Sequence, residues 1–369
     1  MEYKYSNIFT WSSGKPVELN DGSIPVYGSN GIIGYSDKAK YNNKIILGRV
    51  GAYCGSVEYC PDDFNATDNT LITTCNEEYI DYKYAFYMLK VAELNKYAGG
   101  SAQPLITQSI LKHLKCDIPD LEIQNKIASV LSTYDDLIEK NNHKIEILQD
   151  MAEELYKEWF VRFRFPGHEI AKFTDGIPDG WEKVRLKNVV QEVGCNVNPK
   201  DRNNFKYYVP IDCISSHSMV LSEVDSIDNA ESSLISYKKG DILFGVMRPY
   251  FHKVVRAPFN GLTRKTCFVL NSIDEIKHYY AYMLLFQNET IAYATTISVG
   301  STMPYVRWED FSRMNCLLPD DKTLLKFNRI MKTYCRSLEL LQEEINVLKQ
   351  QRDLLLPRLM SGKLEVKVS

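Results

Sequence analysis

Long apolar runs are missing from this sequence. No stretch reaches the roughly 20 residues that cross a bilayer, and the first residues, MEYKYSNIFT, contain no apolar core of a signal peptide. The nine cysteines are scattered without a Cys-x-x-Cys pair, and the six histidines stand apart from one another. Because zinc sites need closely spaced ligands, we expect no bound metal. The nine scattered cysteines indicate reduced thiols in a cytoplasmic protein, and the missing apolar runs predict that there is no membrane segment.

Motifs that mark the common nucleotide-binding enzymes are also missing. The sequence has no Walker A loop, no Gly-rich cofactor loop after a predicted strand and no Asn-Pro-Pro-aromatic methyltransferase motif. The segments PDDF (61–64) and PDLEIQNK (119–126) contain the Pro-Asp of a nuclease motif, but neither provides a Glu-x-Lys at a fitting distance. We therefore expect a non-catalytic chain that binds no cofactor itself.

A strong excess of positive charge is absent as well. The 369 residues carry 44 Lys and Arg against 47 Asp and Glu, a net charge of −3, which excludes a globally basic nucleic-acid binder. The hydrophobic content of 44% and the charged content of 25% are ordinary for globular proteins. The length is sufficient for two domains of usual size.

An internal repeat with a spacing of 200 residues is the strongest feature that is present. The segment GGSAQPLI (99–106) recurs as VGSTMPYV (299–306), and the register continues without a gap. From 99 to 160, 13 of 62 positions are identical to their counterparts, where roughly three or four are expected from composition. The chain is therefore predicted to be a tandem duplication in which each copy is a domain with an appendage. The repeated loop would join the two, with glycine and proline shaping its turn.

Each appendage is predicted to be a long helix. Apolar residues recur at heptad spacing over more than four heptads, which favours pairing of the two helices in a coiled coil over packing on one small domain. Asn141 and Arg352 interrupt this seam. The predicted seam consists of Ile127, Leu131, Tyr134, Ile138, Ile145, Leu148 and Leu155 in the first copy, and of Met331, Tyr334, Leu338, Leu341, Ile345, Leu348 and Leu355 in the second.

Charge and chain order predict that the two helices pair antiparallel. Residues 123–160 have a net charge of −4 and residues 322–360 a net charge of +4, so the helices attract each other. A parallel pair would stretch the linker, residues 161–180, along nearly the whole helix, about 50 Å. An antiparallel pair creates a pseudo-two-fold axis, and the backbone of duplex DNA has the same symmetry. Two related but different domains would then bind two different half-sites.

These features together resemble the specificity (S) subunit of Type I restriction-modification systems. The resemblance rests on the repeat, the two helices and the segments GIPDGWEKVRL (176–186), LYKEWFVRFRFPG (155–167) and LLLPRLMSGKLE (354–365), and it covers nearly the whole chain. It implies an α+β fold: two target recognition domains of mixed α/β structure in a pseudo-two-fold tandem repeat, separated by a long antiparallel two-helix coiled coil. The first copy lacks the full IPDGWE lead-in, so we expect its recognition domain to be trimmed at the N-terminus.

The resemblance also implies domain bounds and partners. The expected partners are double-stranded DNA, two modification (methyltransferase) subunits that bind S-adenosylmethionine, and restriction/translocase subunits. The expected domains are target recognition domain 1 (1–122), spacer helix 1 (123–160), a linker (161–180), target recognition domain 2 (181–321), spacer helix 2 (322–360) and a C-terminal tail (361–369).

Candidate DNA contacts lie in a basic, aromatic-rich segment of the second domain and in its analogue in the first. Residues 237–265 hold seven Lys or Arg and one acidic residue, and residues 43–57 have a similar order of apolar strand, Gly, Arg and Tyr. Lys and Arg neutralise phosphates, and Arg can form two hydrogen bonds with guanine. The predicted DNA-binding residues are Lys44, Arg49, Tyr53, Ser101, Gln103, Lys238, Lys239, Arg248, Tyr250, His252, Lys253, Arg264, Lys265, Ser301, Thr302 and Arg307.

Other interpretations stay open. Each basic residue taken alone is also explained by a solvated protein surface, and the tyrosines and asparagines of VYGSNGIIGYS (26–36) by ordinary turns. The alternative for the whole chain is a coiled-coil scaffold or adaptor that joins proteins without reading sequence. One half of a bipartite system is disfavoured, because both repeats are present.

Overall fold

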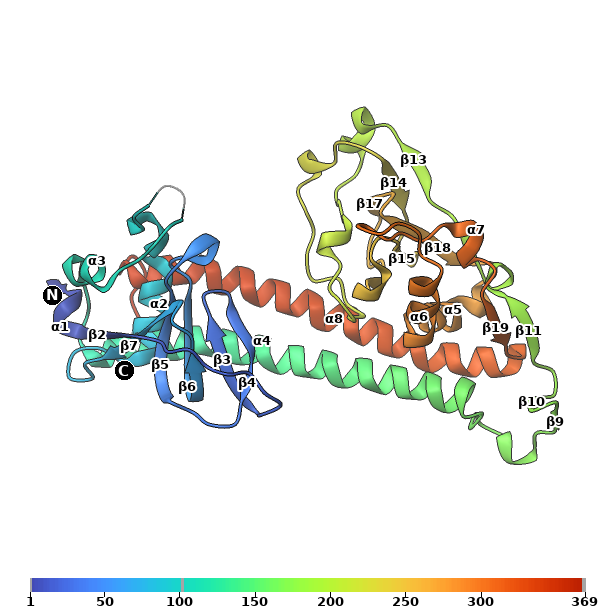
Figure 1. Ribbon diagram of the computed structural model, residues 1–369, viewed down its shortest axis with the longest axis horizontal. Helices are drawn as coiled ribbons and strands as arrows, with labels where there is room; N and C mark the ends of the chain where they lie inside the picture. Colours follow the sequence, from blue (N-terminus) through green and yellow to red (C-terminus); the bar gives the residue numbers. More distant parts are fainter. Residues whose placement is uncertain (1, 101–102, 367–369) are drawn as a thin grey trace. The chain divides into compact units, whose positions relative to one another are not determined.

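The computed structural model describes residues 2–100 and 103–366, and its ribbon is shown in Figure 1. The chain divides into two compact units. Unit 1 consists of Met1–Ile138 and Leu348–Ser369, and unit 2 consists of Glu139–Val347. Both long helices pass from one unit into the other, so each unit holds a globular part and a segment of each helix. No helix within the described ranges is long and apolar enough to cross a membrane.

The two appendages are the long α-helices α4 (Leu121–Tyr156) and α8 (Asp321–Met360). At 1.5 Å per residue they are about 54 Å and about 60 Å long. In unit 1 the N-terminal part of α4 contacts the C-terminal part of α8, since Arg352 Nη1 lies 2.5 Å from Asp135 Oδ1. In unit 2 the end of α4 contacts the start of α8, where the rings of Tyr156 and Phe327 are 6.4 Å apart. The predicted antiparallel pairing is thus confirmed within each unit.

Equivalent caps begin both helices. The Asp120 carboxylate accepts a hydrogen bond from the N–H of Ile123, and the Asp320 carboxylate accepts one from the N–H of Thr323, each at 3.0 Å. These bonds satisfy backbone donors that have no partner inside the helix. The repeated Pro-Asp before each helix therefore has a structural role as its N-cap. At its other end, α4 passes into a π-helical turn, η3 (Lys157–Val161).

All residues of the predicted seam are buried or half-buried. Ile127, Leu131, Ile138, Ile145, Met331, Leu338, Ile345 and Leu348 are buried, and Tyr134, Leu148, Leu155, Tyr334, Leu341 and Leu355 are half-buried. Both interruptions have hydrogen-bond partners. Asn141, 2% exposed, accepts from Lys144 Nζ, and Arg352 forms an ion pair with Asp135, which also accepts from the Tyr87 hydroxyl. Arg352 is therefore charge-paired in the seam, whereas Asn141 Nδ2 is buried without a hydrogen-bond partner among the described residues, which costs stability.

The globular part of unit 1 is built on a six-stranded sheet in the order β2-β7-β5-β6-β3-β4. Its centre is apolar on both faces: Ile45 and Leu47 of β5 face the main core, and Ile46 faces a second cluster around Phe64. The strands are β1 (Glu2–Lys4), β2 (Phe9–Ser13), β3 (Ile24–Gly28), β4 (Gly31–Ser36), β5 (Tyr41–Gly48), β6 (Val57–Ala66), β7 (Thr70–Cys75) and β8 (Lys115–Asp117). The short helices are α1 (Tyr5–Ile8), α2 (Tyr82–Val91) and α3 (Gln108–His113).

The globular part of unit 2 holds a four-stranded sheet, β12-β18-β15-β16, and a three-stranded sheet, β13-β14-β17. Helix α5 is apolar all round and buried from Tyr280 to Phe286, as expected for a core helix. The strands are β9 (Phe173–Thr174), β10 (Ile177–Pro178), β11 (Glu182–Arg185), β12 (Val190–Glu192), β13 (Cys195–Val197), β14 (Leu234–Tyr237), β15 (Ile242–Gly245), β16 (Val254–Arg256), β17 (Gly261–Arg264), β18 (Cys267–Ser272) and β19 (Asn315–Leu318). The helices are α5 (His278–Phe286), α6 (Asn288–Thr296) and α7 (Trp308–Phe311).

The sequence repeat is also a structural repeat. In unit 1 the strand before α4, β8, pairs with β1, and in unit 2 the strand before α8, β19, pairs with β11. Gly100 and Gly300 have φ values of +91° and +101°, a region that side-chain-bearing residues rarely adopt. The predicted α+β fold with two related units and an antiparallel helix pair is therefore confirmed.

Candidate nucleic-acid interface

Three loops of unit 2 meet at one end of its four-stranded sheet. The N–H of Val246, directly after β15, donates to Thr266 O in the β17–β18 turn at 2.9 Å, and Val246 O accepts from the N–H of Val306 at 3.0 Å. The N–H of Arg248 donates to Pro304 O in the repeated loop at 2.7 Å. We call the three joined segments, 246–252, 264–266 and 300–306, the loop end of unit 2.

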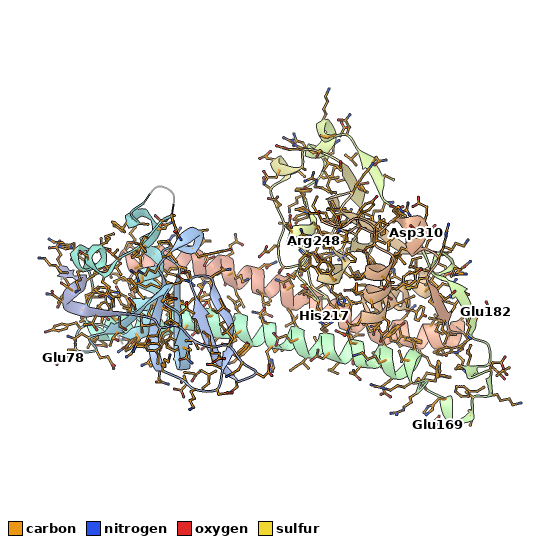
Figure 2. The ribbon with its side chains drawn as sticks, in the orientation of Figure 1. Glu78, Glu169, Glu182, His217, Arg248 and Asp310 are labelled. Atoms are coloured by element: carbon orange, nitrogen blue, oxygen red, sulfur yellow. The ribbon has the colours of Figure 1, made fainter. Side chains whose placement is uncertain are left out.

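Basic and aromatic side chains are exposed at this loop end. Arg248, Arg264 and Lys265 are exposed, and the side chains of Tyr250 and Tyr305 are 52% and 45% exposed. The Arg264 guanidinium donates to Ser232 Oγ at 3.0 Å. The Arg248 guanidinium (Figure 2) has no ion pair or hydrogen bond with any residue that the structure describes. Its donors are free for an external acceptor such as a phosphate or a base edge.

Unit 1 contains the same arrangement. The N–H of Arg49 donates to Asn69 O at 2.9 Å in the β6–β7 turn, and Arg49 O accepts from the N–H of Ile106 at 3.0 Å. The N–H of Gly51 donates to Pro104 O at 3.0 Å, as that of Arg248 does to Pro304 O. The loop end of unit 1 is therefore formed by 49–55, 67–69 and 103–106.

The two loop ends differ in charge. The basic residues of unit 2 have neutral or acidic counterparts in unit 1. The pairs are Arg248 and Gly51, Arg264 and Thr67, and Lys265 and Asp68. The aromatic residue is shared, since Tyr53 and Tyr250 are 53% and 52% exposed. Unit 2 therefore offers more cations to an acidic ligand than unit 1 does.

Arg49 is not the counterpart of Arg248. Its backbone takes the place of Val246, which is 5% exposed, and its own side chain is half-buried. Arg49 Nε is buried without a hydrogen-bond partner among the described residues. The Gly-Arg-Tyr order in the sequence suggested an equivalence that the backbone hydrogen bonds do not support.

Two of the predicted DNA contacts are engaged inside the fold. Lys44 Nζ donates to the Tyr82 hydroxyl at 2.8 Å and lies 5.1 Å from that ring's centre. Lys253 Nζ donates to Ile211 O at 2.8 Å and is half-buried. Both lysines therefore have an acceptor inside the fold, which their charge alone did not indicate, and their contact with DNA stays a prediction.

The remaining predicted residues are distributed as follows. Lys238 and Lys239 are exposed in the β14–β15 turn, at the opposite end of β15 from Arg248, and Lys239 Nζ lies 3.6 Å from Glu339 Oε2 on α8. Arg307 is exposed just after the loop end and pairs with Asp310 at 2.7 Å. Gln103, Ser301 and Thr302 are exposed on the repeated loops, and Ser101 lies outside the described residues.

His252, one of the predicted DNA contacts, is buried rather than exposed. Its side chain packs against His217 and Phe286, with ring centres 4.5 Å and 4.9 Å away, and its Nε2 lies 2.8 Å from Phe286 O. Burial, with a smaller contribution from His217, lowers the pKa of His252 to about 4. The ring is therefore neutral at pH 7, and Nε2 carries the proton because a carbonyl can only accept.

Two polar residues of α4 that the sequence analysis missed hold the segment 217–219, whose His217 packs against His252. Gln149 Nε2 donates to His217 O at 3.0 Å, and Gln149 Oε1 accepts from the N–H of Met219 at 3.0 Å. Glu153 Oε1 lies 3.2 Å from His217 Nε2. Both α4 side chains are almost fully buried. A buried Gln and Glu on a helix face are the signal that could have indicated a polar docking contact.

Comparisons with known proteins agree with this description. The model of the Type I restriction modification DNA specificity domain matches residues 8–149 and 178–350. The chain is similar to the Type I restriction enzyme MjaIX specificity subunit of Methanocaldococcus jannaschii, with 31% identity over 307 residues that cover 77% of this chain and 69% of that protein. It is similar to the MjaVIII specificity subunit of the same organism, with 25% identity over 316 residues, 78% of this chain and 71% of that one.

Among solved structures, the chain resembles the S subunit of a Type I restriction-modification system from M. genitalium. The TM-score is 0.63 with 16% identity, covering 100% of this chain and 96% of that one, so this likeness concerns the fold. With two matched segments spanning both units, the chain belongs to the family of Type I restriction-modification DNA specificity subunits.

Proposed function

We propose that this chain selects the DNA sequence at which a Type I restriction-modification complex acts, and that the loop end of each unit binds one half of a bipartite, asymmetric target. One observation carries the proposal: both units build the same three-loop arrangement but present different side chains on it. Equal backbone scaffolds favour equivalent docking on duplex DNA, while different side chains favour different base sequences.

Partner subunits belong to the proposal. We expect two modification subunits, which would bind S-adenosylmethionine and methylate the DNA, and restriction/translocase subunits that cleave it. The net charge of −3 supports this division, because a chain that bound DNA alone would need more cations to neutralise phosphates. The contribution of this chain would be recognition, and the chemistry would be that of its partners.

A domain exchange tests the proposal. The chain is co-expressed with its modification subunits, and methylated bases are mapped on a plasmid library of random sequence. Residues 181–320 are then replaced by the matching segment of a relative, and the mapping is repeated. We expect one half of the target to change and the other to stay.

The control is the reciprocal exchange of residues 1–122, which should change only the other half. A change in both halves, or in neither, contradicts one half-site per unit. Methylation without sequence preference in the unchanged complex supports the alternative, an adaptor that joins subunits without reading DNA.

A further inference from the structure

Arg248 has a backbone conformation that is unfavourable for arginine. Its φ and ψ are 47° and 62°, in the left-handed region that side chains disfavour. It also precedes Pro249, and a proline restricts the residue before it to extended conformations. In unit 1 the counterpart is Gly51, with a φ of +75°, which adopts this region without a steric penalty. The turn therefore works with glycine, and unit 2 carries arginine there at a cost in stability.

Packing does not explain this arginine. Its side chain is exposed, and its guanidinium is free of partners among the described residues. Its backbone is fixed at both sides, since its N–H donates to Pro304 O at 2.7 Å and its carbonyl accepts from the N–H of Phe251 at 2.9 Å. A long basic side chain can reach a phosphate from many backbone positions. Hydrogen bonding to a base edge requires that the backbone from which the side chain extends is held in one position.

We propose that Arg248 is the specificity-determining residue of unit 2 and that it forms two hydrogen bonds with a guanine in the half-site of that unit. This inference rests on the proposed function. Guanine presents two neighbouring acceptors in the major groove, O6 and N7, which match the planar fork of a guanidinium. Unit 1 has no side chain at the equivalent Gly51, so it must read its half-site from other positions.

His252 acts as a positioning residue for Arg248. It is the second residue of the turn with a left-handed backbone, at a φ of 50°, where unit 1 again has a glycine, Gly55. Its carbonyl accepts from the N–H of His217 at 2.8 Å, and its buried ring bonds Phe286 O. His217 in turn contacts Glu153 of α4. These contacts connect the turn that carries Arg248 to the core of unit 2 and, through His217, to α4.

The test uses the complex of the full chain with its modification subunits and three variants. Arg248→Asn removes the guanidinium but tolerates the left-handed backbone, Arg248→Lys keeps the charge but not the fork, and Arg313→Asn is a matched control. Arg313 is an exposed arginine of unit 2 outside the loop end. Affinity is measured by titration of the mapped target and of targets with each base pair changed, and thermal melting is recorded for each variant.

We expect Arg248→Asn to melt at the same or a slightly higher temperature than the unchanged protein and to bind the target about 5- to 150-fold more weakly, with discrimination lost at one G·C pair in the half-site of unit 2. Arg248→Lys should keep binding to unrelated DNA but lose the same discrimination. Arg313→Asn should behave as unchanged. Binding by Arg248→Asn that weakens equally on every target, with discrimination kept at each base pair, would mean a phosphate contact, and unchanged target binding by Arg248→Asn would remove Arg248 from the interface; either result overturns the inference.

The positioning role of His252 has a separate readout. His252→Gly should weaken discrimination at the same base pair as Arg248→Asn, and adding it to Arg248→Asn should cause no further loss there. His252→Asn, which tolerates the backbone and keeps a side-chain donor, should restore part of the discrimination. Additive losses, or losses in the half-site of unit 1, would show a general structural effect instead. Failure of the proposed function is distinguishable, because the unchanged complex would then show no target preference.

Discussion

Acid should destabilise unit 2 more than unit 1, because two histidines of unit 2 are held neutral. The pKa of His252 and that of His278 are both lowered to about 4 from 6.5, mainly by burial, with Arg256 also lowering that of His278. Below about pH 6.5 the unfolded chain binds protons at these positions, while the folded chain does not until about pH 4. Their contribution to stability is therefore complete above pH 6.5 and declines as the pH falls towards 4.

The magnitude follows from the size of this window. A pH of 5 lies about 1.5 units below the pKa of histidine in the unfolded chain, so protonation of the unfolded chain lowers the free energy of unfolding by about 2 kcal/mol for the buried His252. His278 is half-buried and should add somewhat less. The lowered pKa of Asp320 does not interfere, because its contribution is lost only below its ordinary value of 3.8.

Tryptophan fluorescence during urea unfolding measures this effect. Three of the four tryptophans, Trp159, Trp181 and Trp308, belong to unit 2, so the signal reports mainly on that unit. The urea midpoint should fall from pH 8 to pH 5, and His252→Asn or His278→Gln should reduce that fall. His143→Gln is the control, since the His143 side chain is 71% exposed. If both variants lose as much stability between pH 8 and pH 5 as the unchanged chain, the reasoning is refuted.

Three further predictions concern the long helices. Leu131→Ala, at a fully buried seam position, should lower the free energy of unfolding by about 2–5 kcal/mol, whereas Val130→Ala on the exposed face should change it by less than about 0.5 kcal/mol, as measured by urea unfolding. Arg352→Met should destabilise unit 1 by about 1–3 kcal/mol, because the Asp135 carboxylate keeps only the Tyr87 hydroxyl among its described partners; equal melting temperatures would contradict this. Insertion of seven residues after Leu148 and after Leu348 keeps the heptad phase and lengthens each helix by about 10 Å, so methylation mapping should show the same half-sites with a gap wider by about three base pairs; an unchanged gap at full activity would show that helix length does not set the spacing.

The architecture could be predicted from the sequence because its signals are local or periodic. The heptad of apolar residues defines a helix face wherever it occurs, and the identities at a spacing of 200 residues mark a duplication before any fold is known. The caps at Asp120 and Asp320 are likewise local, since an aspartate bonds a backbone N–H three residues later. These features gave the two units, the helix pair and the family.

The candidate site depended on tertiary structure, because the state of a charged side chain is decided by neighbours that are distant in sequence. In the sequence, Lys44 and Arg248 are both basic residues within or after an apolar strand. In the structure, Lys44 donates a hydrogen bond to Tyr82 of another element, whereas the Arg248 side chain has no partner among the described residues. The equivalence of Gly51 and Arg248 is visible only in backbone hydrogen bonds, since the two loop ends share little sequence. Sequence alone determined which backbone the chain builds twice. Only the folded loops decided which basic side chain has no partner among the described residues, because folding brings together the groups that could pair with it.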